Sequence, residues 1–202
     1  MTGPVAILLT LSRLFLPPSR PRRLLDSRRM HLFAAIGAGG AAGLILLAAY
    51  YATLGLLPPA SAYPSTQFPS MDLANRFDIA QFFGTLLYPP IPTELTWCLG
   101  LMALFGTLVA LGVVYAFLLA WTLQTSSLFH GVGFGAALFV GLGGLFSVAN
   151  GLHPAVLRNA LPDTGVFLLG WSALATVQFF IVNLLYGAVL GTLYQRFAAM
   201  RG

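Results

Sequence analysis

The stretch LFAAIGAGGAAGLILLAAYYATLGLL, residues 32–57, decides the fold class of this 202-residue chain. It contains no charged side chain, and it exceeds the roughly 18–20 apolar residues that a helix needs to cross the hydrocarbon core of a bilayer. Because a backbone in lipid must satisfy its own hydrogen bonds, an uninterrupted apolar run of this length predicts a transmembrane helix.

Three further runs have the same character, at residues 95–121, 128–149 and 166–193, and none holds a charged side chain. The composition agrees, because hydrophobic residues make up 58% of the chain and charged residues only 7%, whereas a water-soluble domain carries about 25% charged residues. The sequence therefore predicts an all-α polytopic membrane protein. Residues 31–202 form its four-helix transmembrane bundle, and residues 1–30 form a basic cytoplasmic arm.

The charge distribution predicts the orientation of this bundle. All ten basic residues are arginine, and eight of them precede the first apolar run or follow the last. The positive-inside rule then puts both termini in the cytoplasm of a bacterial cell, with the loops at residues 58–94 and 150–163 outside the inner membrane. The net charge of +5 is explained by this topology, so nucleic acid is not an expected partner.

The N-terminal arm has two alternative interpretations. An apolar run at residues 5–11 is interrupted too early to span a bilayer, which favours an interfacial segment. The following PPSRPRR, residues 17–23, is stiff and basic, and it either touches acidic lipid headgroups or docks along a partner subunit. The candidate contact residues are Arg13, Arg20, Arg22, Arg23, Arg28 and Arg29.

The first outer loop is expected to contain a short amphipathic helix over residues 70–87, capped by Ser70 and lying on the periplasmic membrane surface. Its apolar positions recur at three- and four-residue spacing, with the polar positions on another side. The apolar set is Leu73, Phe77, Ala80, Phe83, Gly84 and Leu87, and the polar set is Asp78, Gln81 and Thr85.

Small residues spaced four apart predict the packed helix faces, because helix association in lipid relies on close backbone contact. Three of the four runs carry such a ridge. The predicted ridge residues are Ala35, Gly39 and Gly43 in the first run, Gly131 and Gly135 in the third, and Gly187 and Gly191 in the fourth.

Candidate groups for chemistry are sparse. No acidic or basic residue lies deep in any run, which argues against a proton relay or an ion-coupled transporter. His31 and His130 both stand at cytoplasmic ends of runs, where two imidazoles could ligate a haem b iron or one could bind a chlorophyll magnesium. His153 lies in the opposite loop, and each histidine has the alternative interpretation of an ordinary interfacial residue.

The other polar groups at membrane depth are Asn150, Gln178 and Asn183. They are interpreted as interhelical hydrogen-bonding groups, with contact to a quinone or a carotenoid as the alternative. No cofactor is expected outright, and haem, chlorophyll, carotenoid and bound lipid remain candidates.

The layout also resembles a known group of proteins. A Gly/Ala-rich first run is followed by MDL at residues 71–73 and FGTLL at residues 83–87, and the last run ends in LLYGAVLGTLY at residues 184–194. Over residues 35–196 this is similar to bacterial four-helix integral membrane proteins without an assigned activity. The resemblance implies a helix bundle and supplies no catalytic residues.

The expected function is that of a non-catalytic accessory or structural subunit of a larger membrane complex, in a respiratory or photosynthetic electron-transfer context. Its expected partners are membrane lipids and other integral membrane subunits. One alternative is a protein that carries haem or bacteriochlorophyll through its histidines. A second is a small transporter of neutral solutes, for which the runs show no inverted repeat.

Overall fold

The computed structural model describes residues 31–54, 78–87, 94–118, 128–159, 161, 163–170 and 172–200, and these residues form helices and turns without a strand. Four helices are long and apolar enough to cross a membrane, which confirms the predicted all-helical class. They are α2 (Leu32–Leu54), α4 (Glu94–Leu118), α5 (Leu128–Asn150) and α7 (Ala173–Ala199), joined by the short α3 (Ile79–Leu87), α6 (Pro154–Leu157) and the 3₁₀ turn η3 (Val166–Leu168).

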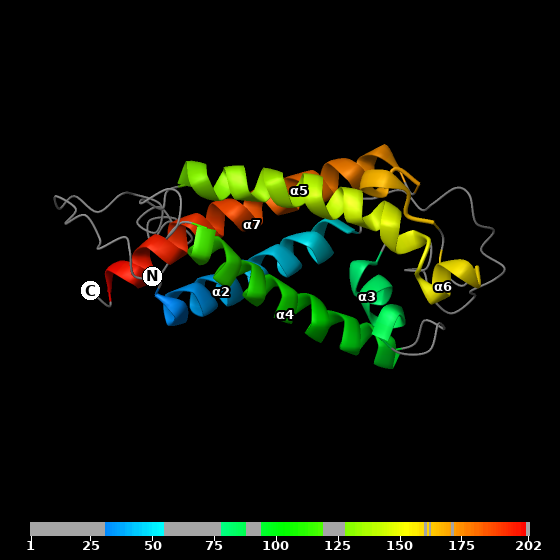
Figure 1. Cartoon of the computed structure of the whole chain (residues 1–202), viewed down its shortest axis with the longest axis horizontal. Coiled ribbons are helices and arrows are strands. Elements are labelled where there is room, and N and C mark those ends of the chain that lie inside the picture. The colour runs from blue at the N-terminus through cyan, green and yellow to red at the C-terminus, as the bar shows by residue number, and fades with distance from the viewer. Residues whose placement is uncertain are drawn as a thin grey trace, which may run out of the picture.

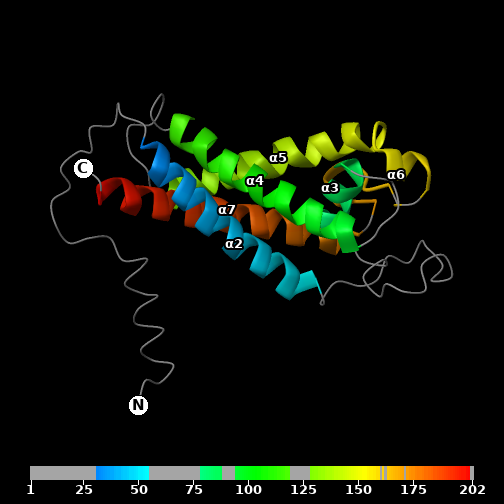
Figure 2. The same ribbon diagram turned by 90° about the horizontal axis from the view of Figure 1, so that it is seen from below.

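The four long helices alternate in direction along the chain. As a result, α2 begins and α7 ends at the same end of the bundle, here called the terminal end (Figure 1, Figure 2). Helix α2 packs between α4 and α7, and α7 packs between α2 and α5. Helices α4 and α5 are bridged by side chains, since the rings of Tyr115 and Phe134 lie 5.1 Å apart.

Helices α4 and α5 diverge toward the other end of the bundle, and α3 lies between them there with α6 beside it (Figure 1). This end is called the α3 end below. Helix α7 is the most enclosed of the four long helices and α5 the least. The core of the bundle is therefore centred on α7, where Tyr186 is fully buried and donates a hydrogen bond to the backbone carbonyl of Leu108 in α4.

The fourth apolar run does not form one helix from residue 166. Residues 166–168 form the turn η3, in which Phe167 and Leu168 both have positive φ, a conformation that L-residues rarely adopt. Helix α7 begins afterwards at Ala173, with the hydroxyl of Ser172 accepting a hydrogen bond from the amide of Ala175 at 3.0 Å. The helix then continues past the expected end at residue 193 and includes Arg196 in its last turn.

Helix α3 is shorter than expected and packs differently. It covers nine residues, and its polar residues Asp78, Gln81 and Thr85 are buried while Leu86 and Leu87 are exposed. The polar positions that were expected on a separate side of a surface helix are thus enclosed within the bundle. Two glycines explain the burial, because Gly84 lies against the carbonyl of Thr96 and Gly100 lies against the carbonyl of Ala80, so the backbones of α3 and α4 are in direct contact. The proposed cap Ser70, with Leu73 and Phe77, lies outside the described residues.

Candidate functional site

The first glycine ridge lies where α2 crosses α4. A Cβ atom added to Gly39 would stand 3.1 Å from the Cα atom of Gly112, and one added to Gly43 would stand 3.1 Å from the Cβ atom of Leu108. Ala35 is fully buried, and its carbonyl faces Gly112 from the other helix. The three predicted ridge residues of α2 thus all lie in this one contact.

The second ridge joins α5 to α7. Gly131 lies against the carbonyl of Gly187 and near the Cα atom of Gly191, and Gly135 lies against the carbonyl of Asn183. An added methyl group at any of these contacts would meet backbone atoms, which have no side-chain freedom to move away. The structure therefore brings all four predicted glycines of α5 and α7 together.

A second set of small residues on α5 faces outward. A Cβ atom added to Gly133, Gly141 or Gly144 would meet no atom within 4 Å, and Ala137, on the same side of the helix, is also exposed. Large apolar side chains flank this strip, and Val140, Leu145 and Val148 are 58–62% exposed. We call the strip formed by Gly133, Ala137, Gly141 and Gly144 the outer strip of α5. From the sequence of this run, a packed face was predicted only at Gly131 and Gly135, and the outer strip was not identified.

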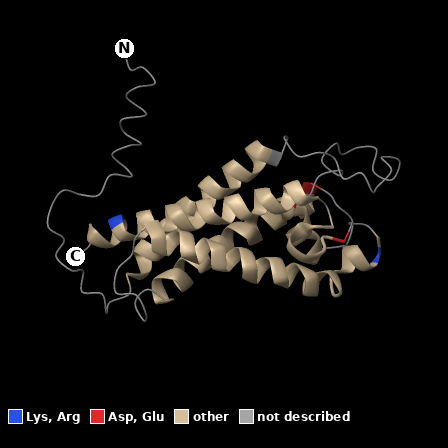
Figure 3. Cartoon of the chain, turned by 90° about the horizontal axis from the view of Figure 1, so that it is seen from above, with Lys and Arg blue, Asp and Glu red and all other residues tan. Residues whose placement is uncertain are grey.

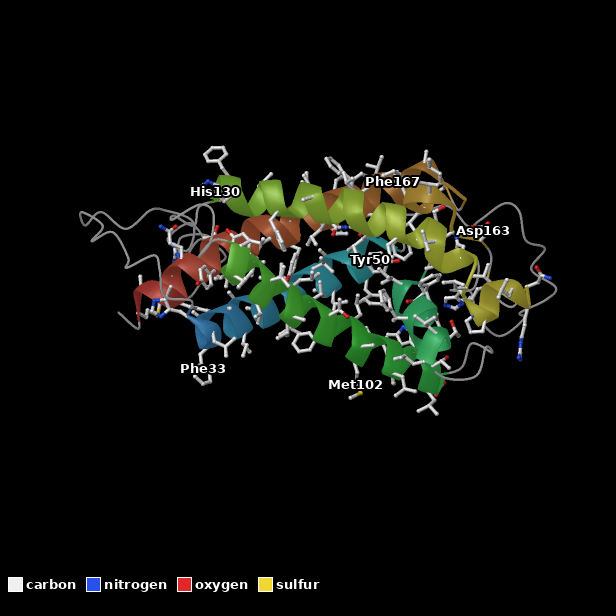
Figure 4. All side chains as sticks on the ribbon, in the orientation of Figure 1. Phe33, Tyr50, Met102, His130, Asp163 and Phe167 are labelled. Atoms are coloured by element: carbon white, nitrogen blue, oxygen red, sulfur yellow. The ribbon has the colours of Figure 1, made fainter. Side chains whose placement is uncertain are left out.

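The three candidate histidines are not brought to one site. His31 precedes α2 and His130 stands in the first turn of α5, both at the terminal end, and α7 lies between these two helices. Figure 4 shows His130 at the end of α5 that lies away from Asp163. His153 is at the α3 end, where its Nε2 atom lies 2.9 Å from the carbonyl oxygen of Phe82 and its Nδ1 atom accepts a hydrogen bond from the amide of Ala155. Both nitrogens of His153 are occupied, so neither is available to an iron or magnesium ion in this arrangement.

A buried carboxylate joins three helices at the α3 end. Asp78 accepts hydrogen bonds from the Tyr51 hydroxyl of α2 at 2.9 Å, from the Trp97 indole of α4 at 3.0 Å and from the Ala80 amide of α3 at 2.9 Å. Burial raises the pKa of this carboxyl, and the hydrogen bonds oppose that shift. Asp78 therefore caps α3 and attaches it to the bundle. The sequence pattern does not reveal this site, because Tyr51 and Trp97 lie 27 and 19 positions from Asp78 along the chain.

The three polar groups expected at membrane depth also form hydrogen bonds. The Gln178 amide donates to the carbonyl of Tyr50 at 3.1 Å and to the hydroxyl of Thr53 at 2.8 Å, which links α7 to α2. Asn150 bonds the turn after α6 through Asp163 and Thr164. Asn183 donates to the carbonyl of Phe179 in its own helix. Gln178 thus makes the interhelical hydrogen bonds that were expected, whereas the hydrogen bond from Asn183 to Phe179 lies within α7.

The charged residues of the described part lie at the two ends of the bundle (Figure 3). Arg196 is at the terminal end, and Asp78, Glu94, Arg158 and Asp163 are at the α3 end. The described residues contain no group of three or more His, Cys, Asp or Glu that could hold a metal ion. The candidate docking residues Arg13, Arg20, Arg22, Arg23, Arg28 and Arg29 lie outside the described residues.

Comparison of the chain with protein-family models, with curated proteins and with solved structures found no match. The resemblance to bacterial four-helix membrane proteins stays an expectation from the sequence.

Proposed function

We propose that this protein is a non-catalytic structural subunit of a larger complex in the bacterial inner membrane, and that the outer strip of α5 receives a transmembrane helix of a partner subunit. The observation that carries the proposal is the open space over Gly133, Gly141 and Gly144. Glycine costs a helix about 1 kcal/mol relative to alanine. Its benefit in a membrane is the close approach of a second backbone.

The inner contacts of the same protein show how it uses such glycines. Gly131 and Gly135 stand on the opposite side of α5, and there the backbone of α7 fills the space that a side chain would occupy. The outer strip has the same spacing of small residues and is flanked by large apolar side chains. A partner helix seated between Val140 and Leu145 would repeat the α5–α7 contact on the free side of α5.

The buried polar groups favour a structural role. Asp78 accepts bonds from α2, α3 and α4, and Gln178 bonds α7 to α2. Groups used in this way hold helices together and are not free to bind a substrate. The proposal therefore assigns binding to the outer surface of the bundle and no chemistry to its interior.

The arginine distribution supports a cytoplasmic terminal end and a periplasmic α3 end. Arg196 in the last turn of α7 fits this orientation. The three acidic residues near the α3 end, Asp78, Glu94 and Asp163, then lie on the outer side.

The partner is proposed to belong to an electron-transfer complex. Isolation of the tagged protein in a mild detergent, followed by mass spectrometry and an absorption spectrum of the co-purified material, tests this part. Haem or bacteriochlorophyll bands that accompany the protein through co-purified subunits support it. Partners without redox groups contradict it and leave the structural role intact.

The proposed face is tested by replacing Gly133 and Gly141 with leucine together. Gly106→Leu is the matched control, because Gly106 on α4 also faces open space. The double variant should insert and remain folded but lose its partner subunit, whereas Gly106→Leu should retain it. Retention of the partner by the double variant would show that the outer strip of α5 faces lipid.

A further inference from the structure

His153 occupies a junction between two parts of the α3 end. The side chain is fully buried, and it is the N-cap residue of α6, accepting the amide of Ala155 at 3.2 Å. On its other side it contacts α3, through the carbonyl of Phe82 and through the Phe82 ring, whose centroid lies 4.3 Å from that of the imidazole. One imidazole therefore caps one helix and binds another.

The two hydrogen bonds determine the protonation state of the ring. A backbone amide can only donate, so Nδ1 of His153 must be the unprotonated acceptor. The proton of the neutral ring is then on Nε2, which donates to the carbonyl of Phe82. The contact with Ala155 requires the neutral ring, because protonation would place an N–H group on Nδ1 directly against the N–H group of Ala155, whereas the Nε2 proton that bonds Phe82 is present in both protonation states.

The contact between His153 and Phe82 matters because other groups attach α3 to α4. Backbone atoms of Gly84 and Gly100 fix α3 on α4, and the Thr96 hydroxyl donates to the Gln81 side chain at 3.1 Å. On the opposite side, the links from α3 to α5 and α6 run through Phe82, which contacts His153 and the ring of Phe146 at 5.4 Å. His153 thus connects the α3–α4 pair to α5 and α6.

Among the described residues, no charged side chain is hydrogen-bonded to His153. The charged residues of the described elements around it are Asp78 at the start of α3, Glu94 at the start of α4, Arg158 at the end of α6, and Asp163 in the following turn, while α5 presents Phe146. Asp78 is bonded to Tyr51 and Trp97, and Asp163 is bonded to Asn150. Burial lowers the pKa of His153, and the bond to Phe82 opposes that shift.

We propose that His153 is a pH-sensitive latch that joins α3 to α6 when its ring is neutral and releases α3 when the ring is protonated. Protonation removes the cap of α6 and leaves a buried charge that, among the described residues, has only the Phe82 carbonyl as hydrogen-bond partner, which is unfavourable unless the ring leaves its site. With the proposed orientation, the latch responds to acidification of the periplasm. The latch itself stands on the contacts of His153 and does not depend on the partner at the outer strip of α5.

The direction and size of the response follow from linkage. The pKa of His153 in the closed state is below the ordinary value of about 6.5 that the released ring adopts. The closed state is therefore fully favoured above about pH 6.5, and its stability is lost as the pH falls from there toward the lowered pKa. Within that window the open fraction should rise about tenfold per pH unit, because release binds one additional proton.

Hydrogen exchange of the full chain in lipid nanodiscs, corrected for the intrinsic effect of pH, tests the latch. Below about pH 6.5, peptides covering residues 79–87 and 153–159 should lose protection progressively, by up to about tenfold per pH unit, while their protection should change little between about pH 7.5 and about pH 6.5, and a peptide covering residues 38–46 of α2 should show no such loss. The variant His153→Gln, whose amide can donate to the Phe82 carbonyl without titrating, should show no such loss. An equal loss in the variant, or no loss in the wild type, would refute the latch.

A second measurement does not depend on the folding of a variant at this buried site. The histidines are labelled with ¹³C and titrated by NMR in the otherwise native protein, and His31→Asn and His130→Asn assign the two signals from the terminal end. The remaining signal should titrate below about 6.5 and together with changes in the Phe82 amide. A His153 signal that titrates at or above that value would overturn the proposal.

Discussion

Gly100→Ala should destabilise the protein strongly, although the substitution adds only one methyl group to an apolar helix. A Cβ atom at Gly100 would overlap the carbonyl of Ala80 and would lie 2.7 Å from the amide nitrogen of Gly84. Both neighbours are backbone atoms of α3, so no side chain can rotate away. The only adjustment is a displacement of α3 from α4.

The cost of that displacement can be worked out from the contacts. Overpacking costs about 1–3 kcal/mol, and moving α3 also breaks the Gln81–Thr96 and Asp78–Trp97 hydrogen bonds, at about 1 kcal/mol each. The higher helix propensity of alanine offsets about 1 kcal/mol. The net loss in unfolding free energy should be about 2–4 kcal/mol.

The assay is equilibrium unfolding in mixed detergent micelles, with Gly106→Ala as the control on the same helix. Gly106 faces open space, so its replacement should be neutral or stabilise the protein by up to about 1 kcal/mol. If Gly100→Ala unfolds at the same denaturant fraction as Gly106→Ala, then α3 does not pack on α4 as described. That result would also remove the basis for the link through Phe82.

Three other predictions address the bundle, its orientation and its arm. Gly187→Leu should weaken the α5–α7 contact, because the new side chain would meet backbone atoms of Gly131, and unfolding in detergent should occur at a lower denaturant fraction; unchanged unfolding would refute this contact. A reporter active only in the periplasm should give signal when fused at Ser65 and none at Ser126, and the reverse pattern would invert the orientation. Deletion of residues 2–23 should leave the orientation of the protein intact. Loss of the partner subunit from the truncated protein would indicate a docking arm. This loss should occur more readily at high salt, because exposed charges are then screened over about 10 Å or less.

The long helices could be predicted from the sequence because length and apolar composition alone are decisive in a membrane. The start of α7 could not be predicted, because the positive φ angles of Phe167 and Leu168 depend on the tertiary contacts of the turn and do not alter the hydropathy of the sequence. There, the ring of Phe167 stacks on Phe139 at 5.0 Å and fills the space beside Gly143. An apolar run longer than a helix was therefore interpreted as helix throughout.

The site at the α3 end was missed for a different reason. Asp78, Gln81 and Thr85 are polar, and they were interpreted as one side of an amphipathic helix that lies on the membrane surface. The contact that buries these side chains depends on Gly84 and Gly100, which are 16 positions apart in the sequence and lie in different helices. Spacing within one helix reveals a ridge, but it does not reveal which ridge of another helix meets it.

The two ends of the bundle differ in what holds them together, and this difference locates where conditions can act on the protein. Toward the terminal end, α5 and α7 meet through the backbone atoms of Gly131 and Gly187, and backbone amides do not titrate. At the α3 end, α3 is held by Asp78 and His153, and both are titratable. Their pKa values move in opposite directions, upward for Asp78 and downward for His153, and in both cases burial disfavours the charged form. Acidification below about pH 6.5, the ordinary pKa of a released histidine, therefore favours release of His153, and the closely packed α5–α7 contact should remain intact while α3 is released.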